Sequence, residues 1–119
     1  MVTRSQRLFF RDILDRIHRI EAYTEAGREA FHQSSEKQDA VIFCFAIIGE
    51  AIKHLNDDLL AQHPHIDWRG FARFRDFLIH QYHNTEIEIA WRAAQEDLPA
   101  LKAAIIALLE TLDDSEAGT

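Results

Sequence analysis

The sequence predicts an all-α domain, on three observations. Only four Gly and two Pro occur among its 119 residues, which leaves few turn-forming positions for a β architecture. Apolar residues make up 47% of the chain and recur at three- and four-residue steps in its long segments, which is the period of a buried helix face. The length fits one domain, so we expect residues 1–113 to form it and the acidic residues 114–119 to be a flexible tail.

The N-terminal part predicts one long helix and one short one. Thr3 or Ser5 can cap a first helix that ends before Gly27, and residues 28–34 can add a short helical turn. The other side of the long helix is charged, so its apolar stripe must face the core. This stripe consists of Phe9, Ile13, Ile17 and Ile20.

A second long helix is predicted from the capping box Ser35-x-x-Gln38 to about His63, where Pro64 must stop it. Residues 41–48 are apolar all the way round, so this part has to be buried on several sides. Both a central helix in a monomer and a helix covered by a second subunit fit that pattern. Cys44 within the run is expected to be a buried, inert thiol.

Gly49 and Glu50 interrupt this apolar helix. A glycine inside a helix costs about 1 kcal/mol relative to alanine, so Gly49 indicates close helix packing or an adjoining cleft. Glu50 can face a functional site or simply pair with Lys53 or His54, and we assign it no catalytic role.

The C-terminal half predicts further helices. Asp67 can cap a helical turn that Trp68 and Phe71 anchor to the core. Thr85-x-x-Glu88 is a second capping box, and Asp97 with Pro99 begins a last helix. The inner stripe of the last helix consists of Leu101, Ile105, Leu108 and Leu112.

Residues 73–83 form the segment in which groups able to do chemistry are most concentrated. The segment lacks Gly and Pro and is predicted to be helical, so at about 100° per residue its side chains divide between two sides. The side expected to face the core holds Phe74, Phe77, Leu78 and Gln81. The polar side holds Arg75, Asp76, His80, Tyr82 and His83.

Two spacings on the polar side bear on function. Asp76 and His80 are four residues apart, so the carboxylate can orient the imidazole and favour its protonated form. Arg75 and His80 are five residues apart, about 140° around the axis, and do not meet on a straight helix. Either the helix begins irregularly near Arg75, or one site takes its Arg and its His from two copies of the chain.

The motif Arg75-x4-His80-x-Tyr82 resembles the signature of HEPN-domain ribonuclease toxins of the HepT type, which are encoded beside a minimal nucleotidyltransferase (MNT) antitoxin. Other segments resemble that family in the same order and at similar spacing, so the resemblance covers nearly the whole chain. They are Asp12-Ile13-Leu14, Asp39-Ala40-Val41, Ile47-Ile48-Gly49-Glu50-Ala51, Ile66-Asp67-Trp68-Arg69, Trp91, and Asp97-Leu98-Pro99 with Leu101-Lys102. The resemblance implies an antiparallel HEPN-type bundle of four to five main helices that forms a homodimer.

The resemblance also implies an activity. We expect the toxin of a type VII-like toxin–antitoxin pair, an endoribonuclease that cleaves tRNA or mRNA at a dimer interface without a metal or cofactor. Arg75 and His80 match the catalytic pair, since His80 can act as acid or base near neutral pH and Arg75 carries a permanent charge. Tyr82 matches the tyrosine onto which the nucleotidyltransferase antitoxin transfers AMP, and this adenylylation blocks the site.

Asp76 stands where the resemblance predicts Asn, and we expect it to support catalysis. Its carboxylate either keeps His80 protonated as a general acid or neutralises Arg75 and weakens catalysis. The net charge of −7 and Asp76 also favour a rival interpretation, in which a non-catalytic helical partner presents a substrate to a nucleotidyltransferase. A metal-binding bundle built on the histidines at 63, 65, 80 and 83 is more distant, because HExxH and CxxC spacings are absent.

Charge and hydropathy limit the classes of binding partner that we expect. Arginines are concentrated in residues 1–35 and 68–92, whereas acidic residues dominate 36–67 and 93–119, so a cationic RNA site can exist on an acidic body. The longest apolar run, residues 40–48, is too short to span a bilayer, and the N-terminus has no signal-peptide pattern. A cytoplasmic protein without a membrane partner is therefore expected.

Overall fold

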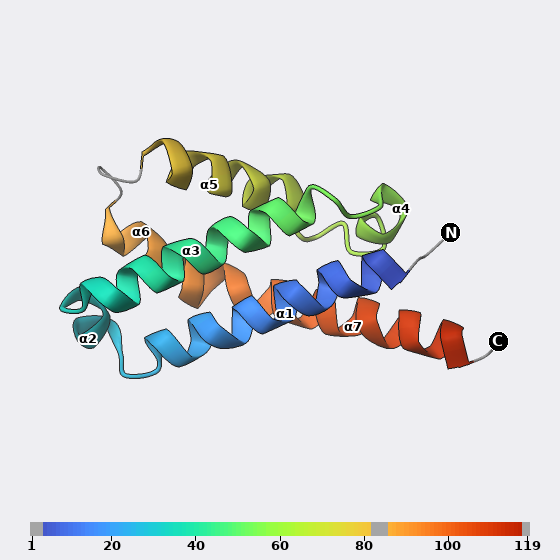
Figure 1. Ribbon diagram of the computed structural model, residues 1–119, viewed down its shortest axis with the longest axis horizontal. Coiled ribbons are helices and arrows are strands. Elements are labelled where there is room, and N and C mark those ends of the chain that lie inside the picture. Colours follow the sequence, from blue (N-terminus) through green and yellow to red (C-terminus); the bar gives the residue numbers. More distant parts are fainter. Residues whose placement is uncertain (1–3, 82–85, 118–119) are drawn as a thin grey trace.

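The computed structural model describes residues 4–81 and 86–117, and within these ranges the chain forms helices and no strand (Figure 1). The helices are α1 (Arg4–Thr24), α2 (Arg28–His32), α3 (Ser35–Ile52), α4 (Asp57–Leu60), α5 (Trp68–His80), α6 (Ile87–Arg92), the π-helical η2 (Ala93–Asp97) and α7 (Leu98–Ala117). The all-α prediction is confirmed.

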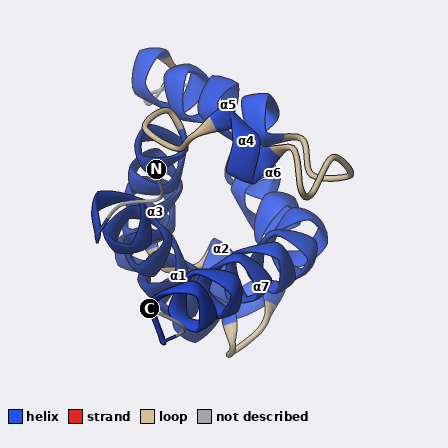
Figure 2. Ribbon diagram, turned by 90° about the vertical axis from the view of Figure 1, so that its right-hand side faces the viewer, coloured by secondary structure: helices blue, strands red, loops and turns tan. Residues whose placement is uncertain are grey.

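The four long helices α1, α3, α5 and α7 run antiparallel to their neighbours (Figure 1). Helix α3 lies between α1 and α5, and α7 packs along the other side of α1. A view along the long axis shows α5 on the opposite side of the bundle from α1 and α7 (Figure 2). The predicted stripe on α7 is buried in the core, as are Val41, Phe45 and Ile48 of α3. On α1, Ile13, Ile17 and Ile20 are buried as predicted, but Phe9 is only partly buried and its neighbour Phe10 lies in the core.

Helix α3 is shorter than predicted, because α1 interrupts it. The helix ends at Ile52 and not near His63. The buried side chain of Gln6 binds the turn that follows, since its Oε1 accepts from the Asn56 N–H at 2.8 Å and its Nε2 donates to the His54 carbonyl at 3.0 Å. Asn56 then precedes the short helix α4. A single side chain from a distant segment therefore decides where α3 stops.

The predicted caps are partly right. The cap of α3 is Ser34, whose Oγ accepts from the Lys37 N–H at 3.2 Å, one residue before the predicted Ser35. Asp67 caps α5 as predicted, because its Oδ1 accepts from the Gly70 N–H at 3.0 Å. Trp68 is buried, and its indole N–H donates to the carbonyls of two preceding residues, Leu60 and His63, both at 3.1 Å.

Helix α6 passes through the π-helical turn η2 into α7 without a break (Figure 1). The wider turn lies just before Pro99, whose ring would clash with the carbonyl four residues earlier in a regular α-helix. Helix α7 continues to Ala117, past residue 113, where the domain was expected to end. Thr85 of the second predicted capping box lies outside the described residues, as does Thr3.

In the described ranges, no helix combines the length and the apolar character that crossing a membrane requires.

Candidate functional site

The site is built on an unusually close contact between α3 and α5. A Cβ atom on Gly49 would lie 2.3 Å from the Cβ of Arg75 and 2.8 Å from the carbonyl oxygen of Phe71, so only glycine fits. The Phe45 and Phe74 rings pack edge to face in the same interface, with their centroids 5.2 Å apart. The close packing predicted from Gly49 is confirmed, and it fixes the base of the Arg75 side chain against α3.

The Arg75 guanidinium is bound by two carboxylates. Its Nε lies 3.4 Å from Glu50 Oε2, and its Nη1 donates to Asp76 Oδ1 at 3.0 Å. Glu50 Oε1 also lies 3.5 Å from His54 Nε2. Glu50 therefore contacts the motif arginine and also pairs with His54, so both roles left open for it are combined. Lys53, the other partner considered, pairs with Asp76.

Asp76 pairs with cations and not with His80. Lys53 Nζ donates to Asp76 Oδ1 at 2.9 Å, on the same oxygen that accepts from Arg75. The hydrogen bond from Lys53, and then that from Arg75, hold the pKa of this carboxyl below its usual value. The i,i+4 contact with His80 does not form in the described chain. Of the two effects considered for Asp76, this geometry is the one that neutralises Arg75.

His80 is the last residue of α5, and its ring is exposed. Helix α5 is α-helical from Trp68 to His80, so an irregular start near Arg75 is wrong. The two motif side chains are then about 140° apart around the axis and about 7.5 Å apart along it. The fold thus separates Arg75 from His80 within one protomer. Tyr82 and His83 lie outside the described residues, and so does any contact they make.

An apolar groove follows the same α3–α5 contact towards the end of α5. Phe43 of α3 is 55% exposed and Ile79 of α5 is 49% exposed. They line a groove of about 360 Å³ together with Asp39, Ile42, Ala46 and Leu78. The predicted apolar side of α5 is only partly buried, because Leu78 is buried and Phe74 half-buried while Phe77 and Gln81 are exposed. Ile79, which the sequence analysis did not single out, belongs to this groove.

Cys44 behaves as predicted. The thiol is buried, and burial raises its pKa above the usual value, although Arg16 lies 4.0 Å from the sulfur and opposes this shift. The same guanidinium lies over the Phe43 ring at 5.3 Å from the centroid. The neutral thiol is therefore inert, and Arg16 flanks the exposed end of the groove.

A cavity larger than this groove lies on the other side of α5. It measures about 610 Å³ and separates α5 from α6 and η2. Five of its lining residues are acidic: Asp67, Glu86, Glu88, Glu96 and Asp97. Burial, and then Glu96, raise the pKa of Asp97. Neither Arg75 nor His80 lines this cavity, although size alone would make it the first candidate for a binding site. Its acidic residues come from three separate segments, so no sequence pattern indicated this cavity.

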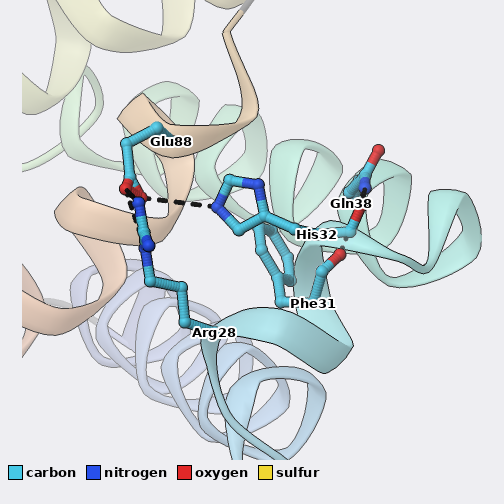
Figure 3. Close-up of polar contacts among 5 residues, drawn as sticks. All are labelled: Arg28, Phe31, His32, Gln38 and Glu88. Carbon is cyan, nitrogen blue, oxygen red and sulfur yellow. Dashed lines mark hydrogen bonds and ion pairs between the residues drawn. The ribbon is translucent and has the colours of Figure 1, made fainter.

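A second cluster of polar side chains joins α2 to α6 (Figure 3). Arg28 forms a two-pronged ion pair with the Glu88 carboxylate, with Nε at 2.8 and 2.9 Å from its two oxygens, and His32 Nε2 lies 3.4 Å from Glu88 Oε1. Arg28, the nearest cation, lowers the pKa of Glu88. Gln38 donates to the carbonyls of Phe31 and His32 at 3.1 and 3.0 Å. Since Arg28 and Glu88 pair with each other, we interpret the cluster as a structural contact that holds α2 against α6.

The structure also bears on the distant metal hypothesis. Among the residues that the structure describes, no group of three or more His, Cys, Asp or Glu side chains is arranged to hold a metal ion. The rings of His63 and His65 contact each other, with centroids 5.9 Å apart.

The chain is similar to proteins that are named as probable or putative ribonucleases. The ribonuclease HepT-like family matches residues 13–108. A Thermococcus cleftensis protein named "Probable ribonuclease HepT" is 41% identical over 83% of this chain and 91% of its own length. A Methanocaldococcus jannaschii protein named "Gamma-glutamylcyclotransferase and putative RNase" is 38% identical over 92% of this chain, which spans half of that protein's length. No solved structure matches the chain significantly.

Proposed function

The chain belongs to the ribonuclease HepT-like family, and on that premise we propose that it is an endoribonuclease whose reaction depends on Arg75 and His80. One structural observation supports a role for Arg75 in addition to the support from family membership. Arg75 is anchored at Gly49 and bound by Glu50 and Asp76, while its side chain stays 28% exposed. A permanently charged group in a fixed orientation and open to solvent is suited to binding a phosphate.

The proposed reaction is a metal-independent transesterification. The ribose 2′-oxygen attacks the adjacent phosphorus, the bond to the 5′-oxygen breaks, and the products are a 2′,3′-cyclic phosphate and a free 5′-hydroxyl. His80 moves a proton, either from the 2′-hydroxyl or onto the leaving 5′-oxygen. Arg75 stabilises the negative charge that develops on the phosphate oxygens. Cellular tRNA and mRNA as substrates imply that the enzyme acts in the cytoplasm.

A second copy of the chain completes this site in our proposal. The supporting observation is that the groove of Phe43 and Ile79 adjoins Arg75, because Ile79 lies one helical turn after Arg75 on α5. A copy of the same chain that covers the groove places its own α5 beside this one. Arg75 of one protomer can then reach the substrate together with His80 of the other, as the 140° separation requires.

We further propose that the protein is a toxin that a nucleotidyltransferase antitoxin silences by transferring AMP onto Tyr82. The support is the resemblance of the motif and the position of Tyr82 two residues after His80. Bulk and negative charge at that position would exclude an RNA phosphate. The variant Tyr82→Phe should keep its ribonuclease activity and escape modification, and continued adenylylation of that variant by the antitoxin would contradict the assignment.

Cleavage of total tRNA and of a defined mRNA in excess EDTA tests the main proposal. The wild-type protein should cleave, the new ends should be 2′,3′-cyclic phosphates, and His80→Ala should lose about 10²–10⁴-fold in rate. His18, an exposed histidine of α1, provides the control, since His18→Ala should cleave normally. Cleavage that stops in EDTA, or that survives in His80→Ala, would overturn the mechanism.

The rival function, a non-catalytic partner subunit of a nucleotidyltransferase, is favoured by two observations. Asp76 neutralises Arg75 in the described structure, and the whole chain has a net charge of −7. An inert wild-type protein with no AMP on Tyr82 by mass spectrometry would establish this rival. Inert protein that carries AMP on Tyr82 would instead support the silenced toxin.

A further inference from the structure

Two cations from different helices converge on one oxygen atom at the proposed site. Lys53 Nζ donates to Asp76 Oδ1 at 2.9 Å, and Arg75 Nη1 donates to the same oxygen at 3.0 Å. The two nitrogens are therefore at most about 6 Å apart. An ammonium and a guanidinium at such a separation can bind oxygens of a single phosphate group.

The cluster lies at the surface, where a long RNA chain can reach it. The side chains of Lys53 and Asp76 are 36% and 48% exposed, so the carboxylate sits at the surface and can be replaced by another anion. Glu50 contacts the Arg75 guanidinium at Nε and Asp76 contacts it at Nη1, while 28% of the Arg75 side chain stays exposed.

The backbone contacts around Lys53 set its position beside Arg75. Lys53 is the C-cap residue directly after Ile52, the last residue of α3, where the negative end of the helix dipole favours a cation. The turn after it is bound to Gln6 of α1, and the backbone of α5 is in contact with Gly49 one turn earlier. Both cations therefore project from a rigid part of the molecule.

From this geometry we propose that Lys53 and Arg75 together bind one phosphate of the RNA, and that Asp76 is the counterion which this phosphate displaces. The inference rests on the proposed ribonuclease function and specifies how that site holds its substrate. Glu50 keeps its contact with Arg75 throughout and orients the guanidinium, so it is a positioning residue. Lys53 is a substrate-binding residue that neither the motif nor its spacing indicates.

The balance of charge explains the role of Asp76. Lys53 and Arg75 face two carboxylates, Glu50 and Asp76, so the cluster is neutral and attracts distant anions only weakly. A phosphate that replaces the Asp76 carboxylate keeps both cations paired. Replacing Asp76 by Asn should therefore strengthen RNA binding, because it removes the competing anion and a repulsive charge at once.

Binding of a fluorescent single-stranded RNA, measured by anisotropy at several salt concentrations, tests the proposal. All variants are made in the full-length protein with His80→Ala, so that the RNA stays intact. Lys53→Gln should weaken binding about tenfold at low salt and reduce the salt slope by about 0.7. Lys102→Gln is the matched control and should bind within twofold of the parent. Lys102 is similarly exposed and also donates to a carboxylate, that of Glu21.

A double variant separates direct binding from an indirect effect. If Lys53 touches the phosphate, Lys53→Gln weakens binding in the Asp76→Asn background as well. If Lys53 acts only by neutralising the charge of Asp76, its effect disappears in that background, and the proposal is wrong. Normal RNA binding by Lys53→Gln, together with lost binding by Arg75→Ala, would refute the inference but leave the proposed function intact. A parent protein that binds no RNA would refute both.

Discussion

The two sides of α5 differ sharply in charge. On the side that faces α3, two cations balance two carboxylates around Arg75, next to an apolar groove. The cavity on the other side is larger, and three of its five carboxylates, Asp67, Glu88 and Glu96, pair with Arg73, Arg28 and Arg92. Glu86 and Asp97 are the other two, so the cavity keeps an excess of negative charge, which disfavours a phosphate. The larger cavity is therefore the poorer candidate for an RNA site, and a net charge of −7 need not exclude such a site where the acidic residues are grouped elsewhere.

The largest expected effect compares one arginine from each side. Arg75→Ala should slow RNA cleavage by about 10²–10³-fold, since it removes the charge that stabilises the transition state. Arg92, which lines the acidic cavity and pairs with Glu96 at 3.6 Å, should tolerate the same change. Initial rates on one RNA substrate decide the matter, with circular dichroism as a check that both variants fold. If both variants lost the same amount of cleavage rate, the site could not be assigned to the α3 side of α5.

The next largest effect is expected on the association of two protomers. Phe43→Glu should break a dimer formed over the groove and weaken its association by about 2 kcal/mol or more, because it places a charge at the centre of an apolar contact. Ile89→Glu is the control, since Ile89 is 39% exposed but lines the acidic cavity. Sedimentation equilibrium measures both variants. A dimer that survives Phe43→Glu and dissociates in Ile89→Glu would move the interface to the other side.

A smaller effect is expected for the helix contact itself. Gly49→Ala introduces a Cβ into a space already filled by Arg75 Cβ and the Phe71 carbonyl, and overpacking outweighs the better helix propensity of alanine. The expected loss is about 1–2 kcal/mol in the free energy of unfolding, measured by urea denaturation. Unchanged or increased stability would show that α5 can move away from α3 at little cost.

The smallest effect is a difference in pH dependence between the two sides. Lys53 and Arg75 lower the pKa of Asp76, so the stability from this carboxylate is present above its unfolded pKa and is lost as pH falls through the lowered value. Burial raises the pKa of Asp97, so the folded state binds the proton more tightly there and gains stability as pH falls towards the ordinary value of about 3.9.

Variants of the two aspartates should separate these contributions. Asp97→Asn should be more stable than the wild type at pH 7, by less than about 0.5 kcal/mol, and the difference should shrink on acidification. Asp76→Asn should lose the stability that the paired carboxylate supplies at pH 7. Urea denaturation from pH 3 to pH 7 measures both, and pH profiles of the same sign for the two variants would be inconsistent with the opposite shifts.

The sequence predicted most of the fold because its local signals agree with one another. The buried positions Ile13, Ile17 and Ile20 of α1, the stripe on α7, the cap at Asp67 and the break near Gly27 all depend on signals within a few residues, and the structure confirms them. The end of α3 was missed because Gln6, almost fifty residues away, binds the turn. The cap at Ser34 was missed because the capping-box pattern favours Ser35, which has Gln38 three residues later, whereas Ser34 has Lys37 at that spacing.

For the site, the sequence by itself determined which groups are present: a motif arginine, a histidine five residues later, and a glycine opposite them in the apolar helix. Only the tertiary structure decided how they are arranged. It brings Gly49, Lys53 and Arg75 together where α3 packs against α5. Asp76 pairs with Lys53 and Arg75, and His80 lies apart from Arg75. The reason is physical, since helix periodicity fixes neighbours along one helix, whereas the partners of a charge depend on which helices pack together and how closely.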